Sequence, residues 1–197
     1  MISLIQITDP HLTENKKTKV KSWLTHSSFE KTIAYIKTNE SPDFILVSGD
    51  ISADGTKKSY VAYQQGIERF EKPVFTILGN HDNHKNFHAV FGTKFPSVEK
   101  ITLSESWLII TIDSTSMNKE SGHLTKQQIH SLRKLIANNR HKSLIICLHH
   151  QPIKMGFWID QVGLENSDQF IASIANQSNV KAVVWGHVHH ESESVLG

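Results

Sequence analysis

The residues of this sequence that could do chemistry are Asp, Asn and His side chains spread over most of its length. Histidine alone accounts for 13 of the 197 residues, more than packing requires, and its usual chemical uses are metal ligation and proton transfer. Mixed oxygen and imidazole donors suit divalent cations such as Mn, Fe, Zn or Co, and the near absence of cysteine argues against a thiolate zinc site. The candidate ligands are Asp9, His11, Asp50, Asn80, His149, His187 and His189.

The number of candidate ligands indicates more than one cation. Seven side chains are too many for a single catalytic ion that keeps an open position. They fit two divalent cations about 3.5–4 Å apart if one carboxylate bridges them, and Asp50 lies centrally among the segments. Such a pair holds a hydroxide at neutral pH, because each cation lowers the pKa of bound water, and it neutralises two oxygens of a phosphate. These residues therefore favour phosphoester hydrolysis.

The candidate ligands follow short apolar, β-branched runs that predict strands. The predicted strands are Ile2–Thr8, Phe44–Ser48, Val74–Leu78, Leu108–Ile112, Ser143–Leu148 and Lys181–Trp185. Helical patterns cover Ser27–Asn39, Lys57–Glu71, His84–Phe91, Thr125–Asn139 and Ser167–Gln177, with Thr125 and either Asn166 or Ser167 as N-caps. Alternating strands and helices predict an α/β fold. Because groups just past the carboxyl ends of strands converge on one crevice in such sheets, the five segments can meet there.

Each motif taken alone also has a simpler structural explanation. Gly49-Asp50 is a common strand-to-turn signal, and Gly79-Asn80-His81-Asp82 is typical of a turn because Asn and Asp bond their own backbone. His187 and His189, two residues apart beyond a strand, would point to opposite sides unless a turn redirects one of them. Five segments at equivalent strand ends outweigh these separate explanations and indicate one site.

Length, charge and hydropathy narrow the class of protein. A chain of 197 residues predicts a single domain over residues 1–197. Its 21 Lys and Arg residues nearly balance 19 Asp and Glu residues, and a net charge of +2 gives no basic face for nucleic acid. No stretch approaches the roughly 20 apolar residues of a membrane span. We expect a cytoplasmic protein with a small phosphodiester substrate and neither a nucleic-acid nor a membrane partner, in which Cys147 is a buried thiol without a redox role.

Five short blocks follow one another along nearly the whole chain: Asp9-x-His11, Gly49-Asp50, Gly79-Asn80-His81-Asp82, His149 and Gly186-His187-x-His189. Their order resembles the signature of the calcineurin-like metallophosphoesterases. The resemblance implies two sheets packed face to face with helices outside them, and an active site across the strand ends. It also implies two divalent cations, for which we expect manganese or iron, with zinc or cobalt as alternatives.

The resemblance assigns a role to each matching residue. Asp9, His11, Asp50 and His189 would hold one cation, and Asp50, Asn80, His149 and His187 the other. His81 would contact the substrate together with Asn80, stabilise the transition state and protonate the leaving alkoxide, with Asp82 orienting the His81 imidazole. His150 is the alternative to His149 as the ligand of the fourth block.

A finer similarity lies in the stretches Leu148–Gln161, Leu164–Asn166 and Trp185–His189. They resemble the bacterial class III 3',5'-cyclic-nucleotide phosphodiesterases and the related glycerophosphodiesterases. This implies hydrolysis of a 3',5'-cyclic nucleotide, cyclic AMP first, by attack of a metal-bridging hydroxide. Phe157 and Trp158 are expected to offer an apolar wall to a nucleoside, and Asn166 a polar contact to the substrate.

Two other functions stay open at this point. A glycerophosphodiesterase or a broad-specificity phosphoesterase would use the same metal core, because that core does not depend on what is attached to the phosphate. A catalytically inactive scaffold is the third hypothesis, although all seven candidate ligands are present.

The C-terminal end of the sequence departs from the family pattern. Related sequences continue for several strands beyond the last block, whereas this sequence ends at Gly197, eight residues after His189. We therefore expect the second sheet to be shortened. An open strand edge invites pairing, which leaves two alternatives: a second copy of the chain completes that edge in a homodimer, or the chain is a shortened version with reduced stability and activity.

Overall fold

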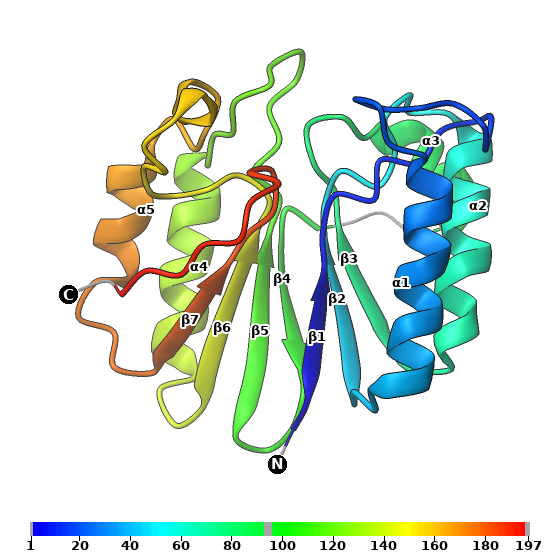
Figure 1. The fold of residues 1–197 in the computed structure, drawn as a ribbon. Coiled ribbons are helices and arrows are strands. Elements are labelled where there is room, and N and C mark those ends of the chain that lie inside the picture. The colour runs from blue at the N-terminus through cyan, green and yellow to red at the C-terminus, as the bar shows by residue number, and fades with distance from the viewer. Residues whose placement is uncertain (1, 93–95, 196–197) are drawn as a thin grey trace.

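Two β-sheets form the centre of the structure, a computed structural model that describes residues 2–92 and 96–195. The first sheet is parallel, with order β1 (Leu4–Ile7), β2 (Phe44–Ser48) and β3 (Val74–Ile77). The second has order β4 (Val98–Thr102), β5 (Trp107–Ile112), β6 (Ser143–Leu148) and β7 (Val180–Val184), with β4 antiparallel and the rest parallel. All strands except β4 point the same way, so their carboxyl ends meet at one end of the molecule (Figure 1).

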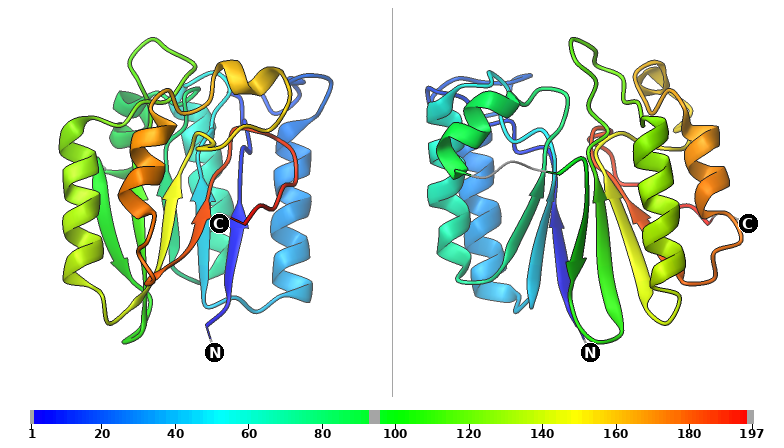
Figure 2. Two further views of the ribbon diagram at one scale, coloured as in Figure 1. Left: turned by 90° about the vertical axis from the view of Figure 1, so that its left-hand side faces the viewer. Right: turned by 180° about the vertical axis from the view of Figure 1, so that it is seen from behind.

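Helices cover the outer face of each sheet (Figures 1 and 2). The first sheet carries α1 (Thr25–Asn39), α2 (Lys57–Ile67) and α3 (His84–Phe91), and the second carries α4 (Lys126–Asn138) and α5 (Ser167–Ile174). Two short 3-10 helices, η1 (Glu68–Phe70) and η2 (Trp158–Gln161), complete the helical elements of the described residues. The predicted arrangement of two sheets flanked by helices is confirmed. None of the helices in the described ranges is long and apolar enough to cross a membrane.

The apolar strands are explained by burial on both faces. Along β2, Ile45 and Val47 belong to the core beneath the helices of the first sheet, whereas Leu46 between them packs against the second sheet. The same alternation places Ile109 of β5 and Cys147 of β6 in the layer between the sheets. Successive side chains of a strand point to opposite faces, so a strand covered on both sides needs an apolar residue at every position. Each fully buried side chain of this kind contributes about 1.5–3 kcal/mol.

Capping side chains and a glycine set helix ends at α3 and α4. Thr125 caps α4 through a capping box, in which its hydroxyl accepts from the Gln128 amide while the Gln128 side chain accepts from the Thr125 amide. Asn83 caps α3 through a single bond, in which its side-chain oxygen accepts from the Asn86 amide. Gly92 ends α3 with a left-handed φ of 69°, a conformation that suits glycine.

The largest differences between the structure and the sequence-based elements lie in three places, and other bounds shift by one or two residues, as where α1 begins at Thr25 and not at Ser27. The predicted helix Lys57–Glu71 ends at Ile67 and tightens into η1, because Glu71 takes a left-handed φ of 54°. The predicted helix to Gln177 ends at Ile174, because Ala175 is extended. The sequence pattern does not predict β4, whose polar Glu99 and Lys100 interrupt the apolar run of this edge strand. Gly197, where the sequence ends, lies outside the described residues.

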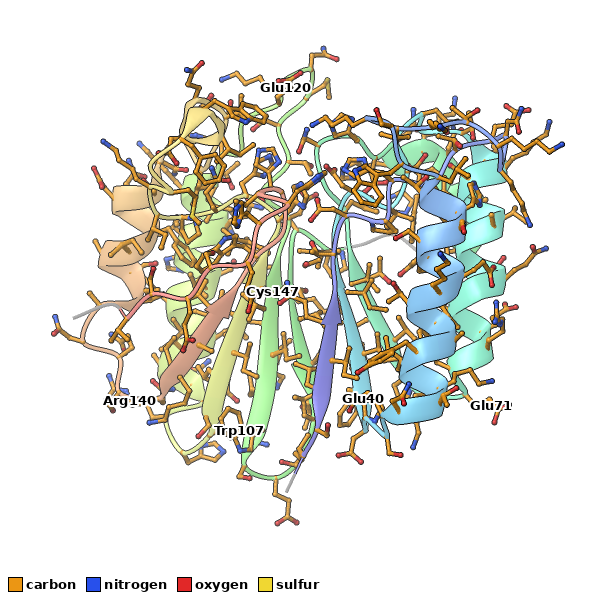
Figure 3. The ribbon with its side chains drawn as sticks, in the orientation of Figure 1. Glu40, Glu71, Trp107, Glu120, Arg140 and Cys147 are labelled. Atoms are coloured by element: carbon orange, nitrogen blue, oxygen red, sulfur yellow. The ribbon has the colours of Figure 1, made fainter. Side chains whose placement is uncertain are left out.

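We expect Cys147 to resist thiol reagents in the folded protein. Its side chain is fully buried between the sheets (Figure 3), and this burial raises the pKa of its thiol, so little reactive thiolate forms. An aromatic disulfide reagent should leave the native chain unlabelled and label its one cysteine after denaturation. Fast labelling of the native chain would show that the layer between the sheets opens readily.

Candidate metal centre

The loops that follow β1, β2, β3, β6 and β7 meet where the two sheets end (Figure 1). Backbone hydrogen bonds join the loops of neighbouring strands within each sheet. The Asp9 amide donates to the Gly49 carbonyl at 3.2 Å, and the Gly186 amide donates to the His149 carbonyl at 3.0 Å. The His187 amide donates to both carboxylate oxygens of Asp9 at 3.1 Å, which links the first loop to the last.

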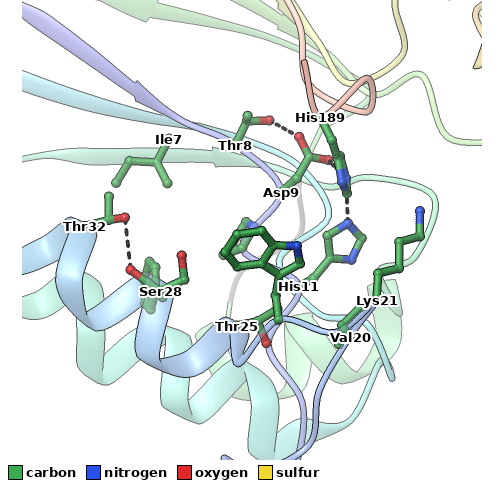
Figure 4. A pocket seen from close by; sticks show the side chains of 13 residues that line it. Ile7, Thr8, Asp9, His11, Val20, Lys21, Thr25, Ser28, Thr32 and His189 are labelled. Atoms are coloured by element: carbon green, nitrogen blue, oxygen red, sulfur yellow. Dashed lines mark hydrogen bonds and ion pairs between the residues drawn. The ribbon is translucent and has the colours of Figure 1, made fainter. Parts of the chain in front are cut away.

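A first group of donors comprises Asp9, His11, Asp50 and His189, and Figure 4 shows three of them, Asp9, His11 and His189. One ligand atom from each lies within 4.8 Å of every other. The Nε2 atoms of His11 and His189 are 2.9 Å apart, and the His189 Nε2 atom is 3.4 Å from the Asp9 Oδ1 atom. The structure therefore brings together the four side chains that the family resemblance assigns to one cation.

A second group lies beside the first, around His149. The His149 Nε2 atom is 3.1 Å from the Asn80 Oδ1 atom and 3.4 Å from the Asp50 Oδ1 atom. The ring of His187 is 5.1 Å from that of His149, measured between centroids. The family resemblance assigns Asp50, Asn80, His149 and His187 to the other cation, and these side chains thus also lie together.

The Asp50 carboxylate lies between the two groups. Its Oδ2 atom is 3.5 Å from His11 Nε2 in the first group, while its Oδ1 atom is 3.4 Å from His149 Nε2 in the second. The side chain is only 1% exposed. A carboxylate whose two oxygens face different donor groups has the geometry of a bridging ligand.

Backbone strain is concentrated at the same residues. The described residues include ten non-glycine residues with positive φ, and five of these belong to the two donor groups: Asp9, His11, Asp50, His187 and His189. A left-handed conformation costs on the order of 1–3 kcal/mol at each non-glycine residue, and such residues cluster at functional sites. In the last block, both histidines are left-handed on either side of the buried Val188, which is the turn needed to aim both at one crevice.

Two glycines allow the ligand loops to pack this closely. A Cβ atom at Gly49 would overlap the His149 imidazole, and one at Gly79 would overlap the Asp50 carboxylate. Gly49 also has a φ of 103°, which other residues rarely adopt. The glycines of the second and third blocks therefore make room for ligand side chains.

We expect Gly49→Ala to disrupt the second donor group and lower bound metal, because the new methyl group displaces His149. The matched control is Gly92→Ala, where φ is also positive at 69° but a Cβ meets no atom within 4 Å. Metal analysis after loading with manganese, with circular dichroism to verify folding, compares the two variants. Equal metal content in both would show that the packing of Gly49 against His149 has no effect on the site.

Hydrogen bonds distinguish His149 from His150. The Nδ1 atom of His149 lies 2.8 Å from the Ser48 carbonyl oxygen, so a proton on Nδ1 leaves Nε2 free to face Asp50 and Asn80. Both ring nitrogens of His150 are engaged instead, Nδ1 with the Ser114 hydroxyl at 2.8 Å and Nε2 with the Glu120 carbonyl at 3.0 Å. One ring nitrogen from each of His149, His150 and His187 lies within 4.8 Å of the other two, so proximity alone does not distinguish His149 from His150. Their hydrogen bonds favour His149 as the donor and give His150 the role of anchoring the loop after β5.

The structure corrects the expected role of Asp82. Its carboxylate accepts hydrogen bonds from the amides of Ile51, Ser52 and Gly79 and from the Tyr60 hydroxyl, at 2.9–3.1 Å. Both oxygens are thus occupied by groups other than the His81 imidazole that Asp82 was expected to orient. Burial, followed by the nearby charge of Asp50, raises the pKa of Asp82 to about 7. Asp82 positions the loops that carry Asp50 and Asn80.

The expected substrate contact from Asn166, in the loop after β6, is also corrected. The Asn166 side chain accepts from the Leu124 amide at 3.0 Å and donates to the Leu124 carbonyl at 2.8 Å, so it holds this loop to the start of α4. The Trp158 ring receives the ammonium of Lys21 at 5.7 Å, and Phe157 lies against His190. None of these three side chains lines the cavity beside the donor groups.

Burial and neighbouring charges shift the pKa values of the donor side chains in different directions. Burial acts against the charge of Asp50, but the charge of His149 and its hydrogen bond outweigh burial and hold the pKa of Asp50 well below its usual range. Burial acts against a charge on His149, but the charge of Asp50, the hydrogen bond to Asp50 and the charge of Asp9 together outweigh burial and raise the pKa of His149 to about 9, so a cation bound at Nε2 would displace a proton there. Burial lowers the pKa of both His11 and His187 to about 4. Neutral imidazoles at these two positions present a lone pair that a cation can accept.

The donors fit divalent cations. Donors bound about 2.1 Å from one tetrahedral cation lie roughly 3.4 Å from one another, close to the separations of 2.9, 3.4 and 3.5 Å in the first group. The buried Nε2 atom of His187 has no hydrogen-bond partner among the described residues. An unsatisfied buried polar atom costs about 1–3 kcal/mol, and a cation would satisfy it.

Sequence reasoning missed Tyr60, which supports the site from α2. Its hydroxyl donates to Asp82 and accepts from the Asn83 amide at 2.6 Å. The side chain is fully buried beside Phe87. A tyrosine inside an apolar helical pattern looks like a core residue, so the sequence carries no signal for this second role.

A family model and two curated relatives match nearly the whole of this chain. A family model described as calcineurin-like phosphoesterase matches residues 2–191. The 3',5'-cyclic adenosine monophosphate phosphodiesterase CpdA of Haemophilus influenzae is 32% identical over 98% of this chain and 72% of its own length. The enzyme of the same name from Vibrio vulnificus is 32% identical over 96% of this chain and 70% of its own length.

A solved structure shares the fold. Purple acid phosphatase from seeds of yellow lupin, Lupinus luteus, superposes with a TM-score of 0.65 at 13% identity. The match covers 95% of this chain and 38% of the lupin chain. At that identity the likeness concerns the fold alone.

Proposed function

This chain belongs to the calcineurin-like phosphoesterase family and is a metal-dependent phosphodiester hydrolase; from that premise we propose that it hydrolyses 3',5'-cyclic nucleotides, with cyclic AMP as its substrate. Two observations support the proposal. The donor groups around Asp50 suit a phosphodiester that spans two cations. The relatives that match nearly the whole chain carry the name of a cyclic AMP phosphodiesterase.

The observation that carries the binuclear proposal is the position of Asp50. Because its two oxygens face different donor groups, one carboxylate serves both. We assign Asp9, His11 and His189 to one cation and Asn80, His149 and His187 to the other. Manganese or iron are the proposed metals. When bound, the cations supply a nucleophile at neutral pH by lowering the pKa of water, and they neutralise the charge of the phosphate.

His81 is the proposed general acid. Its backbone amide donates to the Asp50 Oδ1 atom at 2.9 Å, which fixes the residue beside both donor groups. Its ring lies 5.0 Å from the His11 ring, edge to face, and the residue is exposed. An accessible imidazole that faces the reacting phosphate can donate a proton to the departing 3' oxygen. The 3' hydroxyl group of the product then forms without a negative charge on its oxygen.

A substrate panel tests the proposed function. Protein loaded with manganese is assayed on cyclic AMP, glycerophosphocholine and bis(4-nitrophenyl) phosphate, and chelator-treated protein serves as the control. We expect hydrolysis of cyclic AMP to 5'-AMP, with the highest kcat/KM of the panel, and loss of all activity in the control. A higher kcat/KM for glycerophosphocholine would assign the chain to glycerophosphodiesters. Hydrolysis of the aryl ester alone would indicate a broad-specificity phosphoesterase.

A further inference from the structure

A pocket of about 270 Å³ opens next to the first donor group. Asp9, His11 and His189 form one side of it, and the start of α1 forms another (Figure 4). Its remaining lining includes apolar side chains, among them Val20 and Trp23. The volume is just below the roughly 300–1,000 Å³ of pockets for drug-sized ligands, which is suitable for part of a nucleotide. A group attached to a phosphodiester at the donor groups can therefore enter this pocket directly.

The wall that carries Trp23 is a tight hairpin. The Val20 amide donates to the Trp23 carbonyl at 3.0 Å, and the Trp23 amide donates to the Val20 carbonyl at 2.9 Å. The two residues between them, Lys21 and Ser22, have φ values of 45° and 75°. Two-residue hairpins of this type favour Asn-Gly, because both positions need positive φ. The chain holds two unfavourable residues in this turn, and the turn fixes the position of Trp23.

Packing in the hydrophobic core does not explain the presence of a tryptophan at position 23. The residue is 72% exposed and belongs to none of the core clusters. Its neighbour Lys21 also lines the pocket, and the Lys21 ammonium lies 5.7 Å from the centroid of the Trp158 ring in η2. This cation–π contact ties the hairpin to the loop after β6, on the other side of the site. A strained and tethered turn thus presents an exposed indole at the mouth of a pocket.

We propose, as an extension of the proposed function, that this pocket receives the nucleobase of the cyclic nucleotide and that Trp23 is the wall on which the base stacks. A purine has apolar faces and a polar edge. The indole suits the faces, and the hydroxyl of the exposed residue Ser28 in the lining can both donate to and accept from the edge. Trp23 therefore determines substrate choice, while the donor groups carry out hydrolysis.

The test compares Trp23→Ala with the wild type on two substrates, cyclic AMP and abasic ribose 3',5'-cyclic phosphate. Loss of one stacked base should raise KM for cyclic AMP about 10-fold. We expect kcat to stay unchanged, and KM for the abasic ester to be the same in both proteins. Trp23→Phe should restore most of the affinity. Tyr35→Ala is the matched control, because Tyr35 is an exposed aromatic residue of α1 outside the pocket lining.

A binding measurement separates this inference from the proposed function. Adenosine at millimolar concentration should quench the tryptophan fluorescence of chelator-treated wild type, and Trp23→Ala should remove that quenching. If the wild type does not hydrolyse cyclic AMP, the proposed function fails, and the adenosine titration alone decides the inference. An unchanged KM for cyclic AMP in Trp23→Ala, an equal rise in KM for the abasic ester, or equal quenching of the two proteins would overturn the assignment of Trp23.

Discussion

Replacing His81 with alanine is expected to lower kcat for cyclic AMP by about 10²–10⁴-fold, the usual contribution of a general acid. The imidazole is exposed beside both donor groups, and it is not itself one of the donors. Bound metal should therefore stay at the wild-type level, because the backbone amide that donates to Asp50 is unaffected by the substitution. Steady-state kinetics together with metal analysis of the same preparation measure both quantities.

His130→Ala is the control for His81→Ala, since His130 is an exposed histidine of α4. It should keep the wild-type kcat. A substrate with a better leaving group gives a second check, because an ester of 4-nitrophenol needs little protonation and should lose less activity in His81→Ala. Wild-type turnover of cyclic AMP by His81→Ala, with full metal content, would show that another group supplies the proton.

The second large effect, on metal binding and hydrolysis, is expected from the substitution Asp50→Asn. The substitution keeps the size of a side chain that is 1% exposed, but it removes the negative charge that both donor groups share. Loss of residues that merely support a ligand costs about 10–100-fold in metal affinity. Loss of the shared carboxylate should cost more, and it should affect both cations and abolish hydrolysis. Titration with manganese, followed by calorimetry, measures the number of sites and their affinity.

Asp168→Asn provides the comparison for Asp50→Asn, because Asp168 is an exposed carboxylate in the first turn of α5. It should bind metal like the wild type. If Asp50→Asn lost one cation and kept the other at full affinity, Asp50 would belong to one site and the bridging role would be wrong. Thermal unfolding of the metal-free variants verifies that the comparison is between folded proteins.

Much of the site could be predicted because its residues occupy equivalent places in the sequence. The strands Phe44–Ser48 and Ser143–Leu148 each contain an apolar run and are followed at once by a candidate ligand block, so both their bounds and the residues beyond them were predicted correctly. Parallel strands carry those residues to one end of the molecule. The order of the blocks then identified the family, which the family-model match confirms over residues 2–191.

The partners of single side chains could not be predicted, because they depend on segments far apart in the chain. Asp82 follows His81 directly, yet its carboxylate bonds Ile51 and Ser52, about thirty positions away. Asn166 bonds Leu124 across 42 positions. Trp23 lies in a loop without hydrophobic periodicity, so its place on the pocket follows only from the Val20–Trp23 hairpin. Sequence spacing shows which loops meet, but not which atoms of those loops touch.

A crystal structure of the manganese-loaded protein, with anomalous difference maps, tests the central claim most directly. We predict two anomalous peaks about 3.5–4 Å apart, with one oxygen of Asp50 coordinated to each. Asp9, His11 and His189 should complete the first coordination sphere, and Asn80, His149 and His187 the second. A single peak, or two peaks that do not share Asp50, would contradict the binuclear site.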